Sequence, residues 1–332
     1  MSGIKLTLAL PPYPDDRWEL AVQAGVEYAH PHTAMGTKGL GSGDERIDHV
    51  PTDYDELLRL LNAFENVGLT VPVVGPAGTI SDVTRLGREG RDAEIDAFCA
   101  HLRNVGAVGV PVVTYSWMAR FWWMRTDDRV PLRGNSLSTA YNHEQSEQGP
   151  TEDVGVTAED LWDNLRYFLE RVIPVAEEAG VSLALHPDDP PLSPVRGVPR
   201  IITSPAAYDR VLKIYPSEAN GISFCVGNFV AMDTDVPAMI NHFQDRIHYA
   251  HFRDVDGSAT HFIETWHDEG PSDMYEILQA FVDIGFDGPM RPDHVPTMQG
   301  ETNDRPGYEM KGRLFAVGYM RGLLEALSHE FH

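Results

Sequence analysis

Four side chains that can bind a metal stand at regular intervals in the second half of the sequence. His186, Cys225, His251 and Asp293 are 39, 26 and 42 residues apart. Each closes a short run of apolar, strand-forming residues, as in LALH, SFC, HYAH and MRPD. This set of imidazoles, thiolate and carboxylate suits zinc, and manganese or ferrous iron also accept imidazole and carboxylate ligands. The four residues therefore predict a divalent-metal site, with the identity of the metal left open.

The spacing between these residues is about one β-strand plus one α-helix. Short β-rich runs alternate with amphipathic helical patterns along the whole chain. This alternation favours a closed parallel (β/α)₈ barrel of the α/β class, in which the carboxyl ends of the strands carry the catalytic residues. The four metal-binding candidates would then converge from adjacent strands. The predicted strands are Ile4–Leu10, Val26–Pro31, Thr70–Val74, Pro111–Tyr115, Ser182–His186, Gly221–Val226, Arg246–His251 and Pro289–Asp293.

The alternation extends over residues 1–332, so we predict a single barrel domain, closed by a final helix over residues 312–328. One segment does not fit the pattern. Residues 118–157 mix aromatic, charged and turn-forming residues, which predicts a long loop insertion after strand four. A loop of this length at the catalytic end of a barrel is typical of a lid or a substrate wall. A shorter loop is expected over residues 36–50.

The predicted helix ends, and the lack of a nucleotide-binding motif, agree with the barrel prediction. A glycine closes the long helical pattern at Gly180, and Ser204-Pro205 is a typical helix start. No G-x-G-x-x-G motif opens a helix after the first strand, which disfavours a nucleotide-binding fold.

The composition narrows the class of partner. The formal net charge is −24, which argues against nucleic acid and anionic membranes. Only 4 of the 26 basic residues are lysines, a bias typical of a saline cytoplasm and equally of a genome that favours arginine codons. Two cysteines exclude a disulfide framework. The sequence contains neither a secretion signal nor a membrane-spanning run, so we expect a cytoplasmic protein.

The runs around the four residues resemble the mannonate dehydratase family of the xylose-isomerase-like barrels. The resemblance is dense from residue 110 to about 308 and is carried by HPDDPP, GVPRI, ANGISFCVGN, RIHYAHFRDV, GFDGPMRPDH and the F-x-E-x-x-H of Phe262–His267. It implies dehydration of D-mannonate to 2-keto-3-deoxy-D-gluconate. It also implies Mn²⁺ or Fe²⁺ on the same four ligands, and His294 and Tyr308 as the catalytic pair.

The implied reaction takes a proton from C2, next to a carboxylate, and hydroxide from C3. Such a step calls for a Lewis acid on the substrate oxygens and a base that works near neutral pH, for which His294 is the natural candidate. Tyr308 could donate or relay a proton. We expect Arg253 or Arg291 to hold the substrate carboxylate, although ion pairs at the barrel rim are an equal alternative. Further substrate contacts are predicted at Arg125, Asp188, Asn228 and His267.

Three stretches depart from the family pattern and leave the identity of the substrate undecided. LALPPYPDD lacks the arginine of the family's first strand, Val295-Pro296-Thr297 follows RPDH, and GYEMKGR surrounds Tyr308. Another aldonic acid is therefore an alternative substrate. An aldose–ketose isomerase or epimerase of the same superfamily is a second alternative, which Cys225 opposes because such sites are rich in carboxylates. A non-catalytic metal-stabilised binding protein is a third. The partner expected is a small sugar acid, with a homo-oligomer left open.

Overall fold

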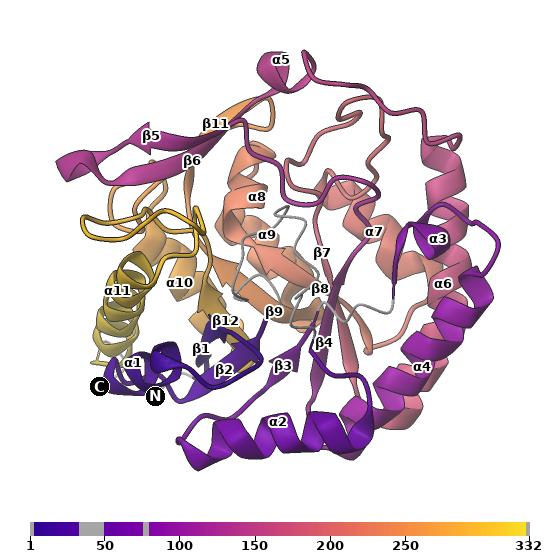
Figure 1. The fold of residues 1–332 in the computed structure, drawn as a ribbon, viewed down its shortest axis with the longest axis horizontal. Helices are drawn as coiled ribbons and strands as arrows, with labels where there is room; N and C mark the ends of the chain where they lie inside the picture. Colours follow the sequence, from indigo (N-terminus) through magenta and orange to yellow (C-terminus); the bar gives the residue numbers. More distant parts are fainter. Residues whose placement is uncertain (1–2, 33–49, 76–79, 330–332) are drawn as a thin grey trace.

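The computed structural model describes residues 3–32, 50–75 and 80–329 and shows eight parallel strands closed into a barrel (Figure 1). Neighbouring strands follow the order β2-β1-β12-β9-β8-β7-β4-β3, and a parallel bridge between Tyr28 and Thr70 joins the two end strands. The predicted (β/α)₈ barrel is confirmed. The barrel strands are β1 Lys5–Leu10, β2 Tyr28–Pro31, β3 Val73–Val74, β4 Val112–Ser116, β7 Ser182–His186, β8 Asn220–Cys225, β9 Ile247–Phe252 and β12 Pro289–Pro292.

Helices surround these strands, and their ends follow local rules. Helix α6 begins at a capping box between Thr157 and Asp160 and ends at Gly180, whose φ of 68° favours glycine. Helix α7 begins with Ser204 as N-cap and Pro205 in its first turn. The helices are α1 Asp16–Gln23, α2 Tyr54–Asn66, α3 Asp82–Arg85, α4 Arg91–Ala107, α5 His143–Ser146, α6 Ala158–Ala179, α7 Pro205–Ile214, α8 Val226–Ala231, α9 Val236–Phe243, α10 Met274–Asp283 and α11 Met310–His329, with 3₁₀ turns η2 Arg133–Asn135 and η3 Gln244–Arg246.

The main core fills the space between the strands and the helix layer. Helix α6, for example, buries Leu165, Phe168 and Leu169, and Phe168 contacts Tyr115 at the end of β4 with ring centroids 5.7 Å apart. Such packing fixes the strand ends relative to one another, which is what a site built from several strands requires. In the part of the chain that is described, no helix is long and apolar enough to cross a membrane.

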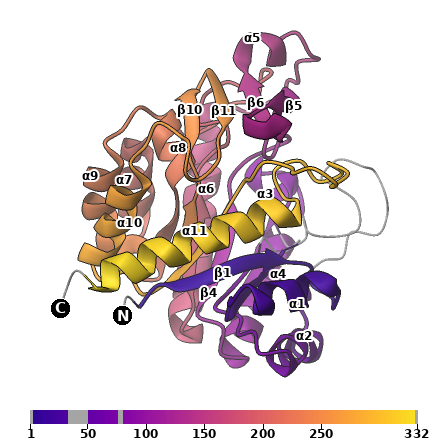
Figure 2. The same ribbon diagram turned by 90° about the vertical axis from the view of Figure 1, so that its left-hand side faces the viewer.

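The predicted insertion over residues 118–157 contains two strands rather than loop alone. They are β5 Asp127–Pro131 and β6 Leu137–Asn142, and β6 pairs with β11 His261–Glu264, which in turn pairs with β10 Val255–Ser258. The resulting four-stranded antiparallel sheet, here called the accessory sheet, stands at one end of the barrel (Figures 1 and 2). The loop predicted over residues 36–50 lies, apart from its last residue, outside the described residues.

Candidate functional site

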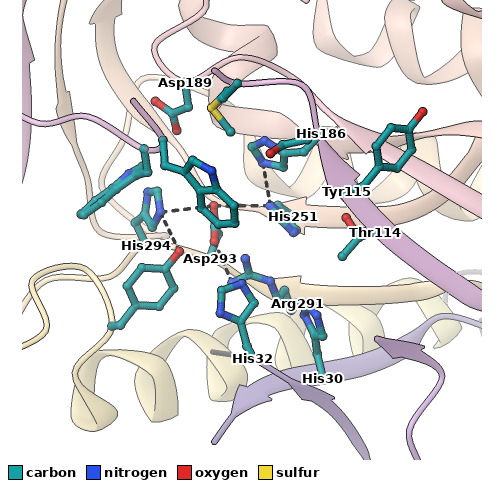
Figure 3. Close-up of a pocket in the computed structure, with 15 residues that line it drawn as sticks. His30, His32, Thr114, Tyr115, His186, Asp189, His251, Arg291, Asp293 and His294 are labelled. Carbon is teal, nitrogen blue, oxygen red and sulfur yellow. Dashed lines mark hydrogen bonds and ion pairs between the residues drawn. The ribbon is translucent and has the colours of Figure 1, made fainter. Parts of the chain in front are cut away.

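A pocket is hollowed at the carboxyl ends of the barrel strands (Figure 3). Its volume, open solvent at the mouth included, is about 620 Å³. Side chains from the ends of β2, β4, β7, β9 and β12 share it with the segment that follows β4, as the barrel prediction required. The lining residues are His30, His32, Thr114, Tyr115, Ser116, Met118, Trp122, Trp123, His186, Asp189, His251, Arg291, Asp293, His294 and Tyr308.

Three of the predicted metal ligands form a tight cluster beside this pocket, here called the ligand cluster. His186 ends β7, Cys225 ends β8 and His251 lies on β9, and their ligand atoms are all within 4.8 Å of one another. His186 Nε2 is 3.2 Å from His251 Nδ1. Burial lowers the pKa of His186 to about 4 and raises the pKa of the Cys225 thiol to about 12. Burial therefore keeps the imidazole neutral, the state in which it binds a metal, and holds the proton on the thiol.

The fourth predicted ligand, Asp293, lies next to the cluster. Its Oδ2 is 3.6 Å from His251 Nδ1 and 4.0 Å from Cys225 Sγ. Two arginines also hold it, because Arg253 Nε donates to Oδ2 at 3.0 Å and Arg291 Nη1 lies 2.7 Å from Oδ1. Burial alone would raise the pKa of Asp293, but Arg291 and the other nearby cations hold it well below its usual range. Asp293 thus adjoins the cluster at His251 and Cys225, and its carboxylate is ionised.

The predicted catalytic pair stands on the next wall of the pocket. Tyr308 Oη is 3.1 Å from His294 Nε2, and the Trp123 ring packs against the imidazole with centroids 4.7 Å apart. Burial raises the pKa of Tyr308, so its hydroxyl keeps its proton. His294 Nε2 is also 3.7 Å from Asp293 Oδ2. The predicted catalytic pair therefore shares one pocket with His186 and His251 of the ligand cluster.

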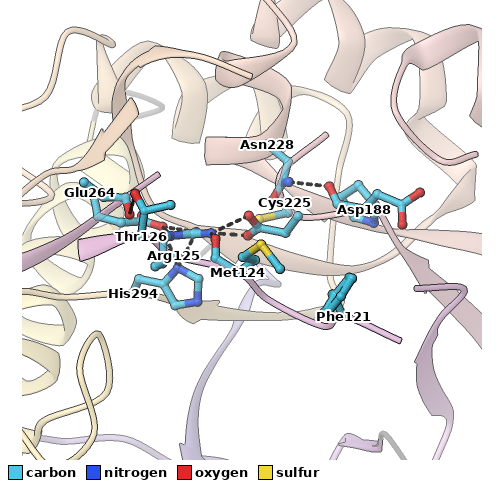
Figure 4. A network of polar contacts seen from close by, with 12 residues as sticks. Phe121, Met124, Arg125, Thr126, Asp188, Cys225, Asn228, Glu264 and His294 are labelled. Carbon is cyan, nitrogen blue, oxygen red and sulfur yellow. Dashed lines mark hydrogen bonds and ion pairs between the residues drawn. The ribbon is translucent and has the colours of Figure 1, made fainter. Parts of the chain in front are cut away.

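Beside the pocket lies a set of buried ions, here called the charge network, made of Arg125, Asp189, Arg253 and Glu264, of which Asp189 also lines the pocket. Figure 4 shows Arg125 and Glu264 of this network. Arg125 forms two hydrogen bonds with the Asp189 carboxylate, at 2.7 and 3.1 Å. Arg253 donates to Glu264 and Asp189, each at 2.9 Å. None of the four side chains is more than 4% exposed. Two cations face two anions, and the hydrogen bonds satisfy them without solvent.

A glycine makes room for this network. Gly227 follows Cys225 in the SFCVGN run, and a Cβ built on it would lie 2.4 Å from Arg253 Nη1. Any side chain at this position would displace the guanidinium. The glycine next to the ligand cluster is therefore explained by the close approach of an arginine.

Of the residues predicted to contact substrate, Arg291 is the one that lines the pocket within the described part of the chain. Arg125 and Arg253 belong to the charge network instead. The remaining three are buried and hydrogen-bonded to the protein, although His267 Nδ1 has no partner among the described residues. Asp188 accepts from the N–H groups of residues 201 and 202, Asn228 donates to the Asp188 carbonyl, and His267 donates to the Phe252 carbonyl.

These side chains support the wall from behind in this structure, and their role as substrate contacts stays a prediction. Asp188, for instance, also forms an ion pair with Arg200 at 3.2 Å, and neither side chain is more than 1% exposed. That contact holds the turn after β7 in place.

Two pocket residues, His30 and His32, were missed by the sequence reasoning. Both come from the end of β2. His30 Nε2 donates to the Gly75 carbonyl at 2.7 Å, which leaves Nδ1 to accept from the Tyr249 hydroxyl at 2.7 Å. Burial lowers the pKa of His32 to about 3. The run YAHPH closes the second predicted strand, so the strand-end rule that indicated the four metal-binding candidates could also have indicated these two histidines.

Comparisons with known proteins agree with the family resemblance of the sequence and with the barrel fold. A family model described as D-mannonate dehydratase (UxuA) matches residues 35–154 and 152–332. A mannonate dehydratase of Thermotoga maritima is 37% identical over 313 residues, covering 82% of this chain and 86% of the relative. The crystal structure of a mannonate dehydratase from Streptococcus suis superposes with a TM-score of 0.85 at 32% identity, covering 99% and 95% of the two chains.

A more distant structure shares the fold. The xylose isomerase domain protein from Planctomyces limnophilus covers 98% of both chains with a TM-score of 0.59 at 12% identity. At this identity the likeness supports the predicted xylose-isomerase-like barrel and says nothing about the reaction.

Proposed function

The chain belongs to the mannonate dehydratase family, and we propose that it is a hydro-lyase that converts D-mannonate to 2-keto-3-deoxy-D-gluconate and water. The observation that carries this proposal is the meeting of the ligand cluster and the His294–Tyr308 pair in one pocket. Removal of water from a sugar acid needs both, because one group of residues must stabilise negative charge and the other must move protons.

We infer that His186, Cys225, His251 and Asp293 hold a divalent metal. The donor atoms suit one. His186 Nδ1 donates to the Pro187 carbonyl at 2.8 Å, so its Nε2 lone pair faces the cluster. A cation among these residues would favour loss of the thiol proton, which burial opposes. Mn²⁺ and Fe²⁺ are our first choices and Zn²⁺ also fits the donor set. When bound, the metal would polarise the substrate oxygens as a Lewis acid.

The proton steps fall to His294 and Tyr308. We propose that His294 Nε2 takes the proton from C2 and that Tyr308 gives its proton to the hydroxyl leaving C3. The raised pKa of Tyr308 supports this direction, because a protonated phenol is a donor rather than a base. The 3.1 Å contact between the two groups then lets the imidazolium return a proton to the phenolate. The enol product becomes the 2-keto acid on its own.

Arg291 is our candidate for the substrate carboxylate. It lines the pocket, and its Nε has no hydrogen-bond partner among the described residues. Burial opposes its charge, but Asp293 and neighbouring groups raise its pKa, so the guanidinium stays charged. Arg253 is the weaker candidate, because its nitrogens already donate to carboxylates and to Asn228.

The test is an assay of metal-reconstituted protein with D-mannonate, following 2-keto-3-deoxy-D-gluconate at low and high salt. We expect turnover that chelator abolishes and that is lost in His294→Asn. The matched control is His242→Asn, which changes an exposed histidine paired with Asp209 and should retain full activity. Absence of turnover in protein that binds one metal per chain would refute D-mannonate as the substrate.

If D-mannonate is not turned over, two further sets of candidate substrates should be assayed. Other aldonic acids test whether His32, which lines the pocket, and the Val295–Thr297 stretch, which follows the pocket residue His294 in the chain, select a different sugar acid. Aldoses test the isomerase or epimerase alternative. A cytoplasmic location is part of the proposal and stays a prediction, as does assembly into a homo-oligomer.

A further inference from the structure

The carboxylate of Glu264 reaches the proposed base from a different sheet. Glu264 ends β11 in the accessory sheet, whereas His294 follows β12 of the barrel. Glu264 Oε1 is 2.8 Å from His294 Nδ1, and the two side chains are 2% and 3% exposed. Oε1 also accepts from Arg125 (Figure 4), and Oε2 accepts from Arg253 Nη1 at 2.9 Å. Two guanidinium groups and one imidazole nitrogen thus face a single carboxylate.

This arrangement determines which ring nitrogen of neutral His294 carries the proton. A carboxylate that accepts from two guanidinium groups has no proton of its own to donate, so the short contact requires N–H at Nδ1. Arg125 Nη2 also faces Nδ1, but at 3.5 Å it is too far to compete with the 2.8 Å contact. His294 Nε2 is then a lone pair, and the Tyr308 hydroxyl donates to it.

We propose that Glu264 is a positioning residue, which fixes the tautomer and the ring orientation of His294 so that Nε2 faces Tyr308 and the pocket. The inference rests on the proposed function to the extent that His294 is taken as the base. Glu264 itself does not line the pocket within the described residues, so it acts through the imidazole. A carboxylate that orients a catalytic or metal-binding histidine in this way is a common supporting device.

The position of the carboxylate is set by the charge network. Arg125 comes from the segment between β4 and β5, and its guanidinium lies over the Phe262 ring at 4.7 Å. Arg253 follows β9 and is bound at the same time to Asp189 and Asp293. The insertion after β4 therefore contributes to orienting the base, in addition to walling the pocket with Trp122 and Trp123.

The test compares Glu264→Gln with Asp189→Asn. Each removes one carboxylate that Arg125 and Arg253 share. Among the described residues Asp189 forms no hydrogen bond or ion pair with the His294 ring, whereas Glu264 binds the ring directly. A glutamine has one acceptor oxygen, which the charged guanidinium groups of Arg125 and Arg253 should hold, so its N–H₂ would turn toward Nδ1. In Glu264→Gln we expect His294 Nδ1 to lose its proton. In Asp189→Asn the tautomer should remain that of the wild type.

The first readout is ¹⁵N NMR of histidine-labelled protein loaded with Zn²⁺, a diamagnetic ion, with the His294 signals identified by their absence in His294→Asn. The ¹⁵N shift separates a protonated ring nitrogen from an unprotonated one. Retention of the Nδ1 proton in Glu264→Gln, or its absence from the wild type, would overturn the proposal. This readout needs no substrate, so it decides the question even if D-mannonate is not turned over.

The second readout is steady-state kinetics with D-mannonate. We expect kcat of Glu264→Gln to fall by about 100-fold or more, with KM changed much less, because the change acts on the base and leaves Arg291 in place. Glu264→Asp keeps the charge but withdraws it by about 1.5 Å, and should recover part of kcat. An equal kcat in Glu264→Gln and Asp189→Asn would reduce Glu264 to a structural member of the charge network.

Discussion

The ligand cluster and the charge network are both buried at the carboxyl ends of the strands, and Asp293 contacts both. The two regions differ in how far the hydrogen-bonding capacity of their polar atoms is filled. In the charge network Arg253 uses its three nitrogens for four hydrogen bonds, and each carboxylate accepts from two arginines. In the ligand cluster, His186 Nε2 and His251 Nδ1 face each other, and His251 Nε2 has no partner among the described residues.

The difference separates two uses of buried polar groups. A network whose donors and acceptors match is complete without any further ligand, and its value lies in rigidity. A cluster of neutral imidazoles and a thiol has few internal hydrogen bonds to lose, which suits atoms that coordinate a cation. We therefore expect mutations in the ligand cluster to act on metal content and turnover, and mutations in the charge network to act on stability, with Glu264 acting on turnover as well because it also binds His294.

The largest effect is expected from Cys225→Ala. Removal of a ligand should lower metal affinity and turnover of D-mannonate by more than about 100-fold, the upper end of what supporting residues contribute. The unfolding temperature of the metal-free protein should change little, because the lost side chain is small. Metal analysis after dialysis, the product assay and calorimetry in chelator measure the three quantities.

The control for this variant is Cys99→Ala, which removes the buried thiol of α4, outside the pocket. It should keep its metal and its turnover. Stoichiometric metal and undiminished turnover in Cys225→Ala would show that the thiol is no ligand.

Arg253→Met in the charge network is expected to lower stability, which Cys225→Ala should leave almost unchanged. The change leaves the carboxylates of Asp189, Glu264 and Asp293 with one cation fewer in a buried site. Loss of one partner from such a site costs about 3–5 kcal/mol of unfolding free energy. Denaturant unfolding of the metal-free proteins measures it. Arg210→Met is the matched control, because it breaks an ion pair with Glu159 that lies in solvent, and a small change is expected. Equal losses in the two variants would contradict our distinction.

The ligand cluster was predictable from sequence because the fold imposes it. Strands of a parallel barrel end in a ring, so residues that close successive predicted strands lie near one another, as His186, Cys225 and His251 do, with Asp293 beside His251. Most strand limits also followed from apolar runs; the largest difference is at β3, which begins at Val73 rather than Thr70. There the chain makes only an isolated bridge with β2.

The charge network was not predictable in this way, because it depends on pairing between distant segments. Residues 118–157 lack a clear alternation, and β5 is largely exposed, so nothing local indicates that β6 pairs with a strand more than a hundred residues later. Without that pairing, Arg125 and Glu264 cannot be placed together. Arg253 and Arg291 likewise look equivalent in sequence, and only the structure shows which guanidinium is surrounded by carboxylates.

The smallest expected effect is on the pH dependence of the unfolding free energy, to which buried histidines and carboxylates contribute in different pH ranges. Burial lowers the pKa of His267 to about 4, whereas an unfolded histidine titrates near 6.5. Between these values the unfolded chain binds more protons, so the unfolding free energy falls as pH falls from about 6.5 to 4, by about 1.4 kcal/mol per pH unit for each such histidine. Arginines hold the pKa of Glu264 below its usual range, although burial opposes them, so its contribution is lost only under more acidic conditions, below about pH 4.3.

His267→Gln tests this separation, because glutamine keeps a donor for the Phe252 carbonyl without titrating. In chelator, denaturant unfolding at a series of pH values should give a shallower loss of stability between pH 6.5 and 4.5 than in the wild type, and the same loss below pH 4. His242→Asn, at an exposed position, should leave the profile unchanged. A wild-type slope in His267→Gln would mean that this histidine accepts its proton in the folded protein, and the acid sensitivity of the region would then belong to the carboxylates of the charge network instead.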